Sequence, residues 1–92
     1  MLVGESALPE QEQAIRVALD GTQSIDRVIH LKTLHVGPDE LLVAAKVAIG
    51  GEDDAATIAA GIDEAEAAIR AALPSARYIY LEPDLDRLAP GP

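Results

Sequence analysis

The stretch that decides the fold is IDRVIHLKTLHVGPDELLVAAKVAI, residues 25–49. Polar and apolar residues alternate along much of it, and a period of two is typical of β-strands, whose side chains point to opposite faces in turn. Gly37-Pro38-Asp39-Glu40 interrupts the alternation with turn-forming residues. The sequence therefore predicts a β-hairpin.

The second arm of the hairpin shows which face is the core. Every second residue of this arm belongs to an apolar set, which we expect to be buried: Val43, Ala45, Val47 and Ile49. Lys46 lies in the other set, so it should point away from the core.

Two helices are expected to flank the hairpin. Pro9 and the glutamates after it are helix-start signals, and the first helix should run from about Pro9 to Leu19 and stop at Gly21. Asp53 and Asp54 can cap a long Ala-rich helix that reaches about Leu73. Its apolar residues recur at helical spacing: Ile58, Ile62, Ala65, Ile69 and Leu73. We expect Ile62 and Ile69 to lie against Val43 and Val47 and to form the centre of the core with them.

A third strand should run from Ala76 to Glu82 and be closed by Pro83, which has no N–H for a ladder. The predicted fold is α+β, an α-β-β-α-β domain with two helices on one face of a three-stranded sheet. The 92 residues allow one domain. We expect a folded part over residues 8–83, a linker stub over residues 1–7 and a flexible tail over residues 84–92.

Composition narrows the function. Seven Lys and Arg against sixteen Asp and Glu give a net charge of −9, which disfavours nucleic acid as a partner. The absence of cysteine excludes thiolate nucleophiles and thiolate metal sites. No apolar stretch is long enough to span a membrane, so a soluble chain is expected. Since no nucleophile, acid or base constellation is found either, we expect that the chain is not an enzyme.

Imidazole and carboxylate groups remain as candidate metal ligands, chiefly His30, His35 and Glu82. By strand parity His30, Lys46 and Glu82 share the open face of the sheet, whereas His35 has the opposite parity to His30. A solvated polar sheet face is the alternative interpretation of the first group.

Four segments, in this order and with these gaps, resemble the C-terminal cytosolic domain of cation diffusion facilitator transporters. They are the stub LVGES, the segment SIDRVIHLKTLHVGPDELLVAAKV, the helix IDEAEAAIRAALP and the closing ARYIYLEP, within residues 2–83. The resemblance implies a domain on the cytoplasmic side of the cell membrane, joined to the transmembrane domain of a divalent metal efflux transporter. It also implies a ferredoxin-like or metallochaperone-like α+β fold. The domain would form a homodimer, with metal at or near the interface that biases the transporter's conformation.

The resemblance further implies which positions hold metal. The family's ligands near the first strand, in the second, and in a His-x-Asp or His-x-Glu motif correspond here to His30, Lys46, Tyr80 and Glu82. Because Lys46 and Tyr80 replace two ligands, we expect weak binding of a divalent ion, zinc first, by His30 and Glu82, with His35 a lesser contributor. A free-standing ferredoxin-like module for a small ligand or a protein partner is the alternative function.

Overall fold

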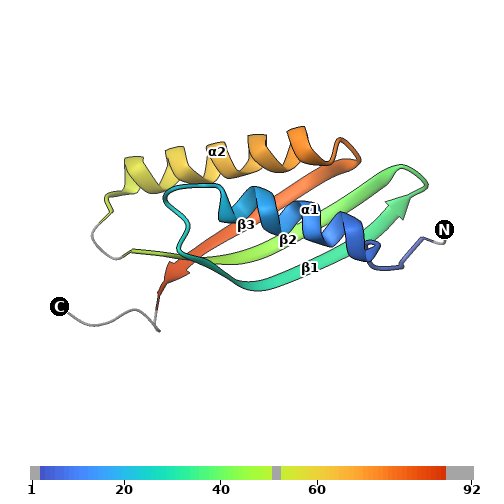
Figure 1. Cartoon of the computed structure of the whole chain (residues 1–92), viewed down its shortest axis with the longest axis horizontal. Coiled ribbons are helices and arrows are strands. Elements are labelled where there is room, and N and C mark those ends of the chain that lie inside the picture. The colour runs from blue at the N-terminus through green and yellow to red at the C-terminus, as the bar shows by residue number, and fades with distance from the viewer. Residues whose placement is uncertain (1–2, 51–52, 87–92) are drawn as a thin grey trace.

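The chain follows the order α1, β1, β2, α2, β3 (Figure 1). The computed structural model describes residues 3–50 and 53–86. The elements are α1 Pro9–Asp20, β1 Arg27–Gly37, β2 Glu40–Ile49, α2 Ala55–Ala72 and β3 Ala76–Leu85. This is the predicted α-β-β-α-β order, and the hairpin turn lies where the Gly-Pro-Asp-Glu segment predicted it.

The three strands form one mixed sheet with β2 in the centre. β1 pairs antiparallel with β2, as a hairpin requires, and β3 pairs parallel with β2 after the α2 crossover. Both helices lie on one side of the sheet (Figure 1). The other side, which we call the open face, is not covered by any described element.

The core lies between the helices and the sheet, and its β2 residues are those predicted from alternation. Val43, Ala45, Val47 and Ile49 are buried, and from the helices they meet Ile15, Leu19, Ala65 and Ile69. The core is aliphatic because the chain has no Phe and no Trp.

The face that α2 presents to the sheet differs by one residue from the prediction. Gly61, Ala65 and Ile69 are buried, at i, i+4 and i+8, whereas Ile62 is only partly buried at the side of this stripe. Gly61 allows a close approach, because a Cβ there would contact the side chain of Ser24. The expectation that Ile62 lies at the centre of the core is therefore wrong, while Ile69 does lie there.

The prediction that Pro83 closes the third strand is wrong. Pro83 is a residue of β3 opposite Val47, and the strand continues to Leu85. An edge strand tolerates proline because one of its sides needs no ladder hydrogen bonds, and within residues 3–50 and 53–86 β3 pairs only with β2. Residues 84–86 thus belong to the folded part, and the rest of the expected tail, residues 87–92, lies outside the described residues.

The predicted linker stub also contacts the sheet. The amide of Gly4 donates to the carbonyl oxygen of His35 over 2.8 Å, and the amide of His35 donates to that of Glu5 over 2.7 Å. The amide of Ala7 donates to the Thr33 hydroxyl over 2.9 Å. Residues 4–7 therefore lie along the outer edge of β1, while residues 1–2 are outside the described part.

Helix α2 begins with the predicted cap. Asp54 accepts a hydrogen bond from the Thr57 amide over 2.8 Å. Hydrogen bonds from the side chain and then the backbone of Thr57 lower the pKa of Asp54. A carboxyl group whose pKa is lowered by folding adds stability at pH values above its usual pKa of about 3.9. This contribution is lost as the pH falls through the lowered pKa of the folded state.

Asp54→Ala is accordingly expected to destabilise the domain at pH 7 more than at pH 3, because pH 3 lies below the usual carboxyl pKa and the contribution of the cap is already reduced there. Thermal unfolding followed by circular dichroism at both pH values measures the difference. Asp63→Ala in the middle of α2 is the matched control, and an equal loss of stability at the two pH values would contradict the capping role.

Candidate functional site

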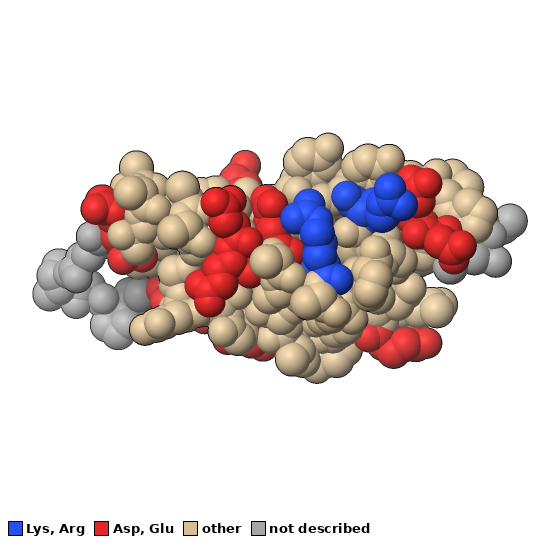
Figure 2. All heavy atoms as spheres, turned by 90° about the horizontal axis from the view of Figure 1, so that it is seen from above, with Lys and Arg blue, Asp and Glu red and all other residues tan. Residues whose placement is uncertain are grey.

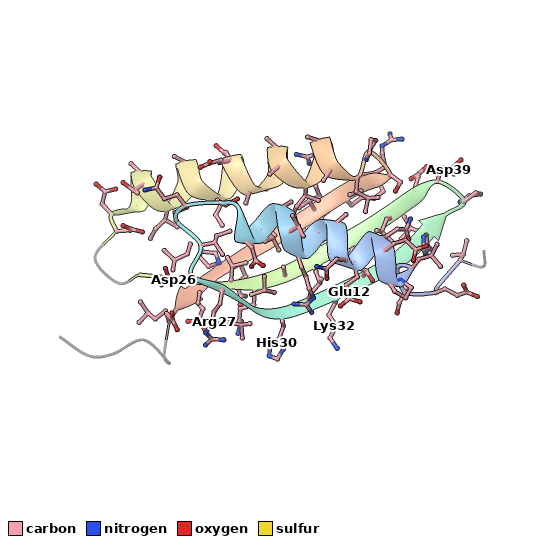
Figure 3. The ribbon with its side chains drawn as sticks, viewed as in Figure 1. Glu12, Asp26, Arg27, His30, Lys32 and Asp39 are labelled. Carbon is pink, nitrogen blue, oxygen red and sulfur yellow. The ribbon has the colours of Figure 1, made fainter. Side chains whose placement is uncertain are left out.

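The open face carries rows of side chains, one from each strand, because residues paired across a sheet share a face. The register sets His30 opposite Lys46 and Lys46 opposite Glu82. In Figure 3, His30 and Lys32 project from β1 away from the helices. The predicted grouping of His30, Lys46 and Glu82 is thus present as a single row.

This row depends on irregularities in the hairpin. The register shifts between His35 and Gly37 and again between Val28 and His30. If the pairing of Gly37 with Glu40 continued without a shift, His30 would lie opposite Val47, a buried residue of the helix side. The shift next to the turn moves His30 to the open face.

Lys46 is the central group of the row. Its Nζ lies 3.2 Å from Oε2 of Glu82 and 3.9 Å from Oδ2 of Asp84. The side chains of Lys46 and Glu82 are 37% and 67% exposed, so their ion pair contributes little to stability. The ammonium group of Lys46 does, however, place a positive charge beside the carboxylate of Glu82, which was predicted to bind metal.

An open groove of about 680 Å³ lies over this part of the sheet. Its polar lining comes chiefly from all three strands, through His30, Lys32, Lys46, Tyr80 and Glu82. The groove offers one imidazole, one phenol, two ammonium groups and two carboxylates, of which the second comes from Glu66 of α2. This set suits a shared or water-completed cation site better than a closed one.

Asp84 was placed in the flexible tail by the sequence, although it completes the arrangement around Lys46. The signal that could have found it is parity: Glu82 and Asp84 are two residues apart, so they share a face once β3 continues through Pro83. Nearby, Arg27 Nε lies 3.2 Å from Oδ1 of Asp86.

His35 is not brought to this row. It pairs with Leu41 on the helix side, is 3% exposed, and donates from Nδ1 to the carbonyl oxygen of Glu5 over 3.1 Å. It therefore lies on the opposite side of the sheet from His30, as parity predicted. Its hydrogen bonds with Gly4 and Glu5 hold residues 4–7 against β1.

Within residues 3–50 and 53–86, no three His, Asp or Glu side chains come together as a metal-binding group. A metal site of this single chain thus has too few ligands among the described residues and needs donors from outside it. The helix side carries a different surface: viewed from above, basic side chains are gathered in a small area among acidic ones (Figure 2).

Neither helix of the described residues has the length and apolarity needed to cross a membrane. No protein-family model matches the sequence, and no curated protein is similar to it.

The solved structures that match include C-terminal domains (CTDs) of MamM, a transporter of the cation diffusion facilitator family. A nickel form of a MamM CTD variant has a TM-score of 0.81 at 14% identity, covering 87% of this chain and 100% of that one. A manganese form gives a TM-score of 0.76 at 16% identity, covering 83% and 95% of the two chains. A zinc form gives a TM-score of 0.78 at 14% identity, covering 85% of each. The chain therefore has the fold of the MamM CTDs, the ferredoxin-like fold that the sequence resemblance implied.

Proposed function

We propose that this chain is the cytosolic regulatory and dimerisation domain of a divalent metal cation efflux transporter. The observation that carries the proposal is the likeness of nearly the whole chain to MamM CTDs, several of them in metal forms. On this proposal, residues 4–7 lead from a transmembrane domain on the cytoplasmic side of the membrane. Their hydrogen bonds to β1 then couple the position of the sheet to the preceding chain.

The proposed metal site is the pair His30 and Glu82, and its first ion is zinc. Each chain supplies one imidazole and one carboxylate, so a tetrahedral site is completed only by water or by a second copy. Lys46 adds a fixed positive charge 3.2 Å from Glu82. Binding is therefore weak, it is coupled to dimerisation, and an occupied site biases the transporter's conformation through the dimer.

Zinc titration calorimetry on the metal-free domain tests the site. His30→Ala and Glu82→Ala are each expected to weaken binding. Lys46→His replaces the opposing charge with a ligand and should tighten binding. His35→Ala, on the other side of the sheet, should weaken binding less than either His30→Ala or Glu82→Ala. If His30→Ala and Glu82→Ala bind zinc as the native domain does, the site is elsewhere, and Asp53 and Asp54 are the next residues to test.

Light scattering tests the dimer. The aliphatic core, with no Phe or Trp, leaves little reserve of stability for a domain of 9.6 kDa. We therefore expect twice this mass at micromolar concentration. A monomer at every accessible concentration, with and without zinc, would contradict the dimerisation role.

A further inference from the structure

Near the hairpin turn, β1 presents its side chains in the reverse of the order that polarity favours. Thr33 and His35 face the helices, and His35 is 3% exposed. Leu34 and Val36 are 41% and 37% exposed. Burial favours apolar side chains and disfavours polar ones that lack hydrogen bonds. A further interaction therefore has to stabilise this register, and residues 4–7, which we call the strap, supply it.

The strap uses every polar group that β1 presents to it here. The amide of Ala7 donates to the hydroxyl of Thr33 over 2.9 Å. Nδ1 of His35 donates to the carbonyl oxygen of Glu5 over 3.1 Å. The backbone N–H of His35 donates to the same carbonyl oxygen, and its own carbonyl oxygen accepts from the amide of Gly4. Four hydrogen bonds thus join the strap to two residues of β1.

A second pairing of the hairpin, which we call the slipped pairing, would reverse these positions. In the structure the register shift leaves Val36 without a partner on β2. In the slipped pairing Lys32 is the residue without a partner, and the residues between them move by one along β2. Val36 then lies opposite Leu41 and Leu34 opposite Val43, so both apolar side chains face the helices. Each pairing leaves one β1 residue of this stretch unpaired, so the ladder is equally long in both.

The strap and the slipped pairing exclude each other. In an antiparallel pair, the N–H and C=O of one residue point both toward the partner strand or both away from it. Those of His35 point away from β2, since both are bonded to the strap. A shift by one residue turns them toward β2, and it turns the side chains of Thr33 and His35 to the open face. The four hydrogen bonds to the strap are then lost.

We propose that the strap locks the register of β1, and that its release moves the unpaired position from Val36 to Lys32 and turns His35 to the open face. The lock connects the chain that precedes the domain with the face that carries His30. Its regulatory consequence rests on the proposed function: the position of the linker would decide whether His35 joins His30 on the metal-binding face.

Engineered disulfides report the register, because the native chain has no cysteine. Leu34→Cys with Leu42→Cys, the native reporter, joins residues that are paired in the structure. Leu34→Cys with Val43→Cys, the slipped reporter, joins residues that are opposite only in the slipped pairing. In the structure these two side chains point to opposite faces of the sheet, and a disulfide cannot bridge such a pair. Both reporters are oxidised in the same glutathione buffer, and mass spectrometry measures the rate.

Proline substitution releases the strap, since proline has no N–H to donate. In the Gly4→Pro, Ala7→Pro variant the slipped reporter should oxidise at least about tenfold faster than with the native strap, as the loss of two hydrogen bonds implies. Ala7→Pro alone should give an intermediate rate, and it carries the test if the double variant does not fold. Ser6→Pro is the matched control, because its amide takes part in none of the four hydrogen bonds.

A second pair of substitutions separates loss of the lock from loss of the fold. Thr33→Val with His35→Leu makes apolar the two side chains that face the helices, so burial should hold the present register without the strap. Added to the strap variant, this pair should return the slipped reporter to its rate with the native strap. Thermal unfolding shows which variants are folded. In a folded, slipped variant the native reporter slows as the slipped reporter speeds up, whereas unfolding would let both oxidise alike.

The outcomes also distinguish this inference from the proposed function. A slipped reporter that oxidises equally fast with and without the strap, or that oxidises in neither case, overturns the register lock. Neither result bears on the proposed function, which zinc titration and light scattering test separately. A domain that binds no zinc and stays monomeric would remove the proposed function and leave the lock standing.

Discussion

Ile69→Ala is expected to lower the free energy of unfolding by about 2–5 kcal/mol, the range for truncating a large aliphatic side chain in a core. Ile69 is 0% exposed and lies in the stripe of α2 that faces the sheet, among Val43, Val47 and Ala65. Small neighbours such as alanine fill little of the space that the side chain leaves, so a cavity should remain. Since small domains are stable by about 5–15 kcal/mol, this substitution should remove a large share of the total.

Urea unfolding followed by circular dichroism measures the effect, and Ile62→Ala is its matched control. Both changes remove the same atoms from the same helix, but Ile62 is only partly buried. Its substitution should therefore cost clearly less than that of Ile69. Equal losses of unfolding free energy for the two variants would show that α2 packs on the sheet with Ile62 as deeply buried as Ile69, as was first expected from the sequence.

Gly61→Ala is expected to destabilise the domain by about 1–3 kcal/mol, as overpacking of a close contact does. A Cβ at this position overlaps the Ser24 hydroxyl and lies 3.0 Å from the Ser24 Cβ. At an ordinary helix position the same change would stabilise the protein by about 1 kcal/mol, because alanine is the better helix former. A loss in place of this gain would show that α2 and the segment before β1 are in contact.

The rescue experiment for Gly61 uses its contact partner. Ser24→Gly removes the atoms that the new Cβ meets, so the Ser24→Gly, Gly61→Ala double variant should recover the stability lost by Gly61→Ala. The coupling free energy from the double-mutant cycle isolates this contact. A cycle with no coupling would contradict the close approach.

Much of the fold could be predicted because its signals are local. Alternation in residues 41–49 located the buried face of β2, and Gly37-Pro38 located the turn. Asp54 located the start of α2 through its cap. These patterns depend only on residues that are close together in the sequence, so they can be recognised without the tertiary structure.

The candidate site was predictable only in part. Parity put His30, Lys46 and Glu82 on one face and His35 on the other, and the structure has this arrangement. The metal-binding roles of His30, Glu82 and His35 stay predictions. Asp84 was missed as a partner of Lys46 because Pro83 was taken as the end of a strand, whereas proline is excluded only where both sides of a strand need hydrogen bonds.

The sequence by itself determined the order of the elements, the apolar face of β2 and the excess of acidic charge, because each follows from residue type and spacing. Only the tertiary structure decided which residues meet. The register shift beside Gly37 sets His30 against Lys46 in place of Val47. The packing of α2 buries Gly61 close to Ser24 and leaves Ile62 only partly buried. Both arrangements depend on contacts between residues that are far apart in the chain. A shift of one residue in strand register or helix face exchanges a buried position for an exposed one, and local periodicity does not reveal such a shift.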